Sequence, residues 1–186
     1  MRVLGVDPGL SRCGVGIVEG TGRRPCAVSA GVITTPTDAA VSRRLHLLHS
    51  ELTALIERTR PDAVAVERVF FNTNVRTAMS VGQAAGIVML AAEQAGLPLT
   101  EYTPTQVKAA VAGSGAADKQ QVGFMVRTLL RLAEVPTPAD AADALALALC
   151  HLNSGTTPAG DGALSPRLAE ALAEAAPGAQ IQRPRR

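Results

Sequence analysis

Two short apolar segments of the chain each end in a carboxylate, and one amphipathic segment separates them. Residues 3–7 (Val-Leu-Gly-Val-Asp) and 62–67 (Asp-Ala-Val-Ala-Val-Glu) are typical of buried strands. Residues 38–58 carry apolar side chains at a period of about 3.6 residues, which predicts a helix. A strand, a helix and a strand in this order predict two parallel neighbours in one sheet. Asp7 and Glu67 would then emerge at the same edge of that sheet.

The residues after Asp7 predict a tight turn that holds this carboxylate at the end of its strand. Pro8 and Gly9 suit the two central positions of a type II turn, because proline sets φ and glycine supplies a positive φ. Considered alone, Asp7 could simply open the turn. A functional interpretation depends on where the later carboxylates lie.

Two more strands are predicted at residues 14–19 and 27–34, so that the first three strands form an antiparallel meander. Gly14 and Gly16 lower the strand propensity of the second one. Glycines inside a strand often mark the close approach of another backbone or of a ligand.

The second half of the chain alternates helices with a single strand. Its predicted elements are a helix at 75–94, a strand at 98–102 and helices at 105–111 and 118–132. Thr137 and Pro138 suit the N-cap and the first position of a last helix. Asp140 and Asp143 stand three residues apart on that helix, so both carboxylates point to one face.

Length and composition limit the classes of protein to which the chain can belong. The chain has 186 residues, and we expect a globular α/β domain at residues 1–153 followed by a flexible or marginally helical tail at 154–186. Three cysteines, without metal-ligand spacing, are typical of reduced thiols in a cytoplasmic protein. No signal peptide or membrane span is predicted. The formal net charge is only +2, so any binding of nucleic acid requires a local basic patch.

Lysines and aromatic residues, which often contact nucleic acid, are scarce in this chain, whereas arginine is abundant. The only two lysines, Lys108 and Lys119, flank a glycine-containing loop at 113–115. Phe70 and Phe71 are two of only four aromatic residues, and they follow the second carboxylate-terminated strand. Because adjacent residues leaving a strand point in different directions, one of them is expected to be exposed, where a stacked base would contribute about 1–3 kcal/mol. Packing of both in the core is the alternative.

Four carboxylates that converge without a counter-charge repel one another, and a divalent cation removes that repulsion. Oxygen ligands without histidine or cysteine favour Mg²⁺, with Mn²⁺ as a substitute, over zinc. Two such ions about 3.5–4 Å apart can serve the attacking water and the leaving oxygen in the hydrolysis of a phosphodiester. We therefore expect a phosphodiester hydrolase with two ions in its active site.

Five motifs occur in order along the chain. They are Gly-Val-Asp-Pro-Gly at 5–9, Val-Glu-Arg-Val-Phe at 66–70, Gln-Val-Lys at 106–108, Asp-Lys-Gln-Gln-Val at 118–122 and Asp-Ala-Ala-Asp-Ala-Leu-Ala at 140–146. With these motifs the chain resembles RuvC, the family of bacterial Holliday-junction resolvases in the RNase H-like superfamily, from Met1 to about Leu152. The first motif alone is weak, whereas five in order at this spacing are strong.

The resemblance implies an RNase H-like mixed five-stranded sheet, with three antiparallel strands and then two parallel ones, flanked by helices. It also implies an endonuclease that resolves four-way DNA junctions by paired symmetric nicks in recombination and repair. The resemblance further implies a homodimer that acts with the RuvA–RuvB branch-migration complex. The implied catalytic and metal-binding residues are Asp7, Glu67, Asp140 and Asp143. The expected DNA-binding residues are Phe70, Arg76, Lys108 and Lys119.

Other functions of a similar fold make different demands on the sequence. A non-catalytic junction-binding module would tolerate the loss of carboxylates, yet all four candidate acids are present. A small RNA-processing RNase H-like nuclease would share the first strand, but the matches at Phe70, Lys108 and Lys119 argue against it. Sugar kinases and actin-like ATPases share an early Asp-x-Gly turn, but they need two such domains and this chain has room for one.

Overall fold

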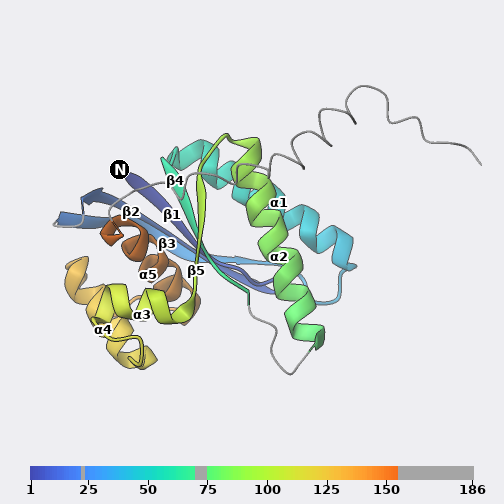
Figure 1. Ribbon diagram of the computed structural model, residues 1–186. Helices are drawn as coiled ribbons and strands as arrows, with labels where there is room; N and C mark the ends of the chain where they lie inside the picture. Colours follow the sequence, from blue (N-terminus) through green and yellow to red (C-terminus); the bar gives the residue numbers. More distant parts are fainter. Residues whose placement is uncertain (22–23, 70–74, 155–186) are drawn as a thin grey trace, which may run out of the picture. The chain divides into compact units, whose positions relative to one another are not determined.

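The computed structural model describes residues 1–21, 24–69 and 75–154, except for the side chains of residues 21, 75 and 76 (Figure 1). Phe70, Phe71, the side chain of Arg76 and nearly all of the predicted tail therefore lie outside the described residues. The described elements are β1 (Arg2–Asp7), β2 (Arg12–Thr21), β3 (Arg24–Thr34), α1 (Val41–Thr59), β4 (Ala63–Glu67), α2 (Val75–Gln94), β5 (Leu99–Tyr102), α3 (Pro104–Ala112), α4 (Lys119–Leu129) and α5 (Ala139–Asn153). Within these ranges, no helix combines the length and the hydrophobicity needed to span a bilayer.

The described strands form one mixed sheet with the order β3-β2-β1-β4-β5. β1 pairs antiparallel with β2, and β2 with β3. β4 runs parallel to β1, and β5 parallel to β4. The predicted sheet of three antiparallel and two parallel strands is confirmed, and the predicted helices are present with ends shifted by a few residues.

Helices cover both faces of the sheet, and the alternation of side chains decides which residues face which layer (Figure 1). One apolar core lies between the sheet and the pair α1 and α2. The other contains Val3 of β1 and Ala65 of β4 and is closed by α3, α4 and α5. Because the side-chain period of a strand is two residues, Asp7 lies on the same face as Val3, and Glu67 on the same face as Ala65. Both carboxylates thus belong to the α5 side of the sheet.

Helix α5 lies directly against β1 and β2 because these strands carry glycines where it crosses them. A Cβ atom on Gly14 would overlap the backbone carbonyl oxygen of Asp140. A Cβ atom on Gly16 would come within 2.8 Å of the backbone nitrogen of Leu145. The close approach predicted for these glycines is therefore that of the helix backbone, and it brings α5 onto the end of the sheet where Asp7 lies.

Two local predictions are wrong. The turn after β1 is not of type II, because Gly9 does not have a positive φ; its backbone instead approaches the Arg12 carbonyl so closely that a Cβ atom would overlap it. The N-cap of α5 is Pro138 rather than Thr137, because Pro138 keeps an extended backbone with φ −73° and ψ 173°. Helical dihedral angles begin only at Ala139, so that the first helical residue follows the proline.

Candidate active site

Asp7 and Glu67 stand side by side at the ends of two parallel strands. The last printed pair of the β1–β4 register joins Val6 to Val66, and each carboxylate is the next residue of its strand. Both line a pocket of about 290 Å³. A side-chain hydrogen bond joins the two carboxyl groups. The predicted meeting of the two strand ends is confirmed.

The electrostatics of this pair favour a shared proton. Burial raises the pKa of Asp7 to about 7, with further contributions in the same direction from the negative charges of Glu67 and Asp143. Burial also raises the pKa of Glu67, although its bond to Asp7 and the charge of Lys119 act in the opposite direction. Two carboxylates this close disfavour simultaneous ionisation. The pair therefore retains a proton near neutral pH unless a cation lies next to it.

Asp143 reaches the same pocket from α5. Its Oδ2 atom accepts a hydrogen bond of 3.3 Å from Nζ of Lys119, the first residue of α4. The charge of Asp143 is the main reason why the pKa of Lys119 is raised. Asp118 fixes the start of α4 through a capping box with Gln121. This cap therefore fixes the backbone position of Lys119, the first residue of the helix.

Asp140 lies one turn before Asp143 and is oriented differently. Its Oδ2 atom accepts two hydrogen bonds from Arg12, one from Nε at 3.0 Å and one from Nη2 at 2.7 Å. Asp140 does not belong to the described lining of the pocket. Its charge nevertheless contributes to the raised pKa of Asp7. Three of the four predicted acids thus surround one pocket, and the fourth stands at its border, held by an arginine.

Each of the four acids already has a partner. In the described ranges, no group of three or more histidine, cysteine, aspartate or glutamate side chains has an arrangement that could hold a metal ion as it stands. The four acids therefore stand on elements that meet at one end of the sheet, but their carboxylate groups do not converge on one point. The side chains of Asp140 and Asp143 instead bond to Arg12 and Lys119.

The two predicted lysines differ in their surroundings. Lys108 of α3 is half-buried and lines the pocket together with Lys119, whose side chain is 80% exposed. Thr103 caps α3 through a capping box with Gln106 and so fixes the helix that carries Lys108. A second pocket, of about 220 Å³, shares Glu67 with the first one. The described hollow therefore continues past the acids along the end of β4.

A larger hollow of about 670 Å³ lies between α3 and α4. Its described lining consists of small, amide and apolar side chains such as Ser114, Gln120 and Phe124, and it contains no ionisable group. General acid–base or metal chemistry requires such groups. The smaller pocket that contains the carboxylates is therefore the candidate active site.

The described site contains one charged neighbour of the acids, Arg12, that the sequence did not reveal. Arg12 and its partner Asp140 are 128 residues apart, and no local pattern connects them. The only signal was the position of Arg12 shortly after the Asp7 turn. The predicted roles of Phe70 and Arg76 concern side chains outside the described residues and remain predictions.

This combination of a mixed sheet, acids at the ends of β1 and β4 and a last helix carrying two further acids defines the RNase H-like class of nucleases. A sequence model of the family described as "Crossover junction endodeoxyribonuclease RuvC" matches residues 3–151. The chain belongs to this RuvC family.

Individual relatives agree over most of the chain. A crossover junction endodeoxyribonuclease RuvC of Frankia alni is 56% identical over 185 residues, covering 99% of this chain and 88% of that protein. The corresponding protein of Salinispora arenicola is 60% identical over 159 residues, covering 84% and 90%. A solved structure of T. thermophilus RuvC in complex with a Holliday junction substrate matches with a TM-score of 0.80 and 41% identity. That match covers 83% of this chain and 94% of the other chain.

Proposed function

We propose that this protein is a divalent-metal-dependent endonuclease that resolves four-way DNA junctions by paired symmetric nicks. The observation that carries the proposal is the pocket in which Asp7, Glu67 and Asp143 meet, with Asp140 at its border. Buried acids with raised pKa values in a pocket next to lysines are the groups expected at a site of phosphodiester hydrolysis. Family membership assigns the DNA junction as the substrate.

The donor set fits a hard divalent cation. All four candidate ligands offer carboxylate oxygens, which favour Mg²⁺ or Mn²⁺. Bound cations, two per site in our proposal, would neutralise the carboxylates and stabilise the negative charge that develops on the phosphate. The raised pKa values of Asp7 and Glu67 support this, because burial and the neighbouring negative charges disfavour ionised carboxylates that a cation would stabilise. Cation binding would require Asp140 and Asp143 to give up bonds to Arg12 and Lys119.

The protein's own groups have separate roles around the acids. The raised pKa values of Asp7 and Glu67 favour protonation of this pair, and both groups would have to be ionised to act as ligands. Lys108 and Lys119 border the pocket and would bind the phosphates next to the scissile bond as mobile point charges. The family resemblance adds Phe70 as a stacking group, and Arg76 is a further expected DNA-binding residue.

Paired nicks in opposed strands require two active sites, and we propose that a homodimer supplies them. Helix α2 presents a face on which Met79, Met89 and Leu90 are exposed by 61%, 37% and 46%. Gly82 and Gly86 lie on the same face, and no heavy atom would come within 4 Å of a Cβ atom on either. Residues at spacings of three and four share one side of a helix. A second copy of α2 could therefore approach closely, as in a symmetric dimer.

The experiment that tests the function compares cleavage of a synthetic four-way junction with cleavage of a linear duplex of the same sequence, with Mg²⁺ and with chelator. We expect paired nicks in the junction, little cleavage of the duplex and none in chelator. Equal cleavage of both substrates would indicate a general nuclease, and binding without cleavage would indicate a junction-binding module. In the cell we place the activity in the cytoplasm, in recombination and repair with the RuvA–RuvB complex.

A further inference from the structure

Arg12 is the charged residue at the site for which the proposed hydrolysis has no role. It is the first residue of β2, and both of its hydrogen bonds to Asp140 end on the same oxygen, Oδ2. The pair is accessible to solvent, with side-chain exposures of 50% for Arg12 and 31% for Asp140. The guanidinium group therefore stands at the outer border of the acidic pocket, next to the helix that carries two of the acids.

Hydrogen bonds hold the backbone segment before Arg12 in place. Arg44 of α1 is only 9% exposed, and it donates to Thr35 Oγ1 at 3.0 Å and to Ser11 Oγ at 2.7 Å. Thr35 in turn donates to the carbonyl oxygen of Leu10 at 2.5 Å. These bonds hold the two residues before Arg12 against α1 and the end of β3. The backbone position from which the Arg12 side chain reaches Asp140 is thus set by the fold.

We infer that Arg12 is a positioning residue that competes with the divalent cation for Asp140 and so sets the cation affinity of this side of the site. The inference rests on the proposed function, because it takes Asp140 as a ligand. Arginine keeps its charge at any working pH. The oxygen that accepts two charge-assisted bonds from Arg12 cannot hold a cation at full strength at the same time. Cation binding therefore has to displace the guanidinium group.

When a cation displaces Arg12 from Asp140, the guanidinium group is left at the border of the pocket without a carboxylate partner. A DNA phosphate next to the scissile bond is the anion that can take the place of Asp140. Arg12 would then couple the two ligands, because cation binding to Asp140 frees a contact for the DNA backbone. This coupling predicts opposite effects of the residue on the two ligands. A purely structural role would weaken both kinds of binding together.

The test is calorimetric titration of Mn²⁺ into the full chain without DNA, comparing the wild type with Arg12→Gln. Loss of an exposed ion pair should tighten cation binding about threefold to fivefold. Arg12→Lys keeps a charge at the same place and should remain close to the wild type. In the Asp140→Asn background the Arg12→Gln change should have no effect on cation affinity, because the competition has been removed.

The second readout is junction binding, measured in the Asp7→Asn background so that the DNA is not cut. With Mn²⁺ present, Arg12→Gln should weaken junction binding and lower the slope of log K against log salt by about one. Tighter cation binding together with weaker DNA binding supports the inference. Unchanged or weaker cation binding in Arg12→Gln would overturn it.

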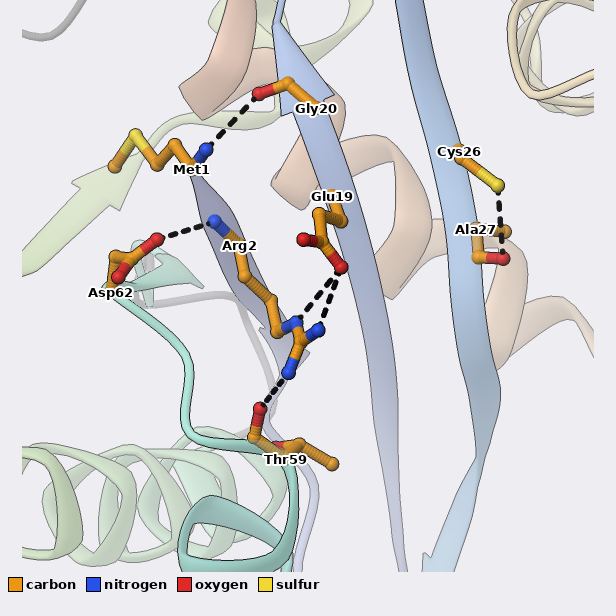
Figure 2. Close-up of polar contacts among 8 residues, drawn as sticks. All are labelled: Met1, Arg2, Glu19, Gly20, Cys26, Ala27, Thr59 and Asp62. Atoms are coloured by element: carbon orange, nitrogen blue, oxygen red, sulfur yellow. Dashed lines mark hydrogen bonds and ion pairs between the residues drawn. The ribbon is translucent and has the colours of Figure 1, made fainter.

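The matched control is Arg2→Gln, at the opposite end of the sheet. Figure 2 shows Arg2 donating from its guanidinium group to Glu19 and to the carbonyl oxygen of Thr59. Its bonds to one oxygen of Glu19, at 3.2 and 2.7 Å, closely match those between Arg12 and Asp140. Arg2→Gln should lower the melting temperature and leave cation affinity unchanged. An equal shift in both variants would also overturn the inference. A wild type that binds no cation and cuts in chelator would instead overturn the proposed function.

Discussion

Gly14 of β2 faces the backbone carbonyl of Asp140 so closely that no side chain fits between them. The contact matters because it decides how near α5 comes to the end of β1. Asp7 pairs with Gly14 in the β1–β2 register, so the missing side chain lies beside the carboxylate at the end of the central strand. The approach of α5 to the end of β1 thus depends on a hydrogen atom in place of a methyl group at this position.

Replacing Gly14 by alanine should therefore reduce both stability and cleavage. The added methyl group must push α5 away from the sheet, and overpacking of this kind costs about 1–3 kcal/mol in the free energy of unfolding. Denaturant unfolding and junction cleavage measure the two effects. Gly31→Ala is the control, because no heavy atom would come within 4 Å of its Cβ atom, and its effect should stay within about 0.5 kcal/mol. Equal losses in both variants would contradict the proposed contact.

Asp7→Asn should abolish cleavage while leaving junction binding largely intact. The substitution keeps the size of the side chain and removes a cation ligand, so we expect the cleavage rate to fall at least about 100-fold. Single-turnover cleavage and a gel-shift titration separate the two effects. Asp38→Asn, at an exposed position before α1, should behave like the wild type. Normal cleavage by Asp7→Asn would refute the assignment of the site.

The raised pKa of Asp7 predicts how stability depends on pH in the presence of a chelator. Its ordinary value is 3.8 and the folded value is about 7, so the folded protein binds more protons than the unfolded chain between these pH values. The stabilisation is complete below pH 3.8 and is lost as the pH rises through 7. We expect Asp7→Asn to be more stable than the wild type at pH 8, by on the order of 2 kcal/mol, and less dependent on pH.

Chemical denaturation at several pH values checks this expectation, and saturating Mg²⁺ should remove most of the difference by neutralising the acids. A wild type whose stability rises from pH 5 to pH 8 in chelator would contradict the raised pKa of Asp7.

Lys108 and Lys119 should contribute to the salt dependence of junction binding. Each phosphate contact releases counterions, so Lys108→Ala and Lys119→Ala should each lower the slope of log K against log salt by about one. Arg58→Ala is the control, because this exposed residue lies in the last turn of α1, at the sheet end away from Asp7. Slopes that remain at the wild-type value would place the DNA backbone elsewhere.

The exposed face of α2 should be required for self-association. Gly86→Glu puts a charged side chain into the face where a second helix would have to approach, and it should shift the protein toward a monomer. Val28→Glu replaces another exposed apolar residue, 48% exposed on β3, and should leave the assembly unchanged. Sedimentation velocity measures both variants. A dimer that survives Gly86→Glu would place the interface on another surface.

Much of the fold and the site could be predicted from local patterns. The strand ending in Asp7, the crossover helix and the strand ending in Glu67 follow from periodicity and from the rule that such units are parallel. The shared face of Asp140 and Asp143 follows from helical geometry alone. The type of turn at Gly9 and the cap of α5 could not be predicted, because both depend on backbone contacts that only the packed chain supplies.

The sequence by itself determined which carboxylates exist, which ends of which elements carry them and that two strand ends must meet. Periodicity and chain direction act over a few residues, and they suffice for these features. Only the tertiary structure decided that Asp140 is held by Arg12, that Asp143 is held by Lys119 and that burial next to Glu67 raises the pKa of Asp7. Ion pairs and pKa values depend on distances and burial between residues far apart in the chain, and no local pattern encodes those distances.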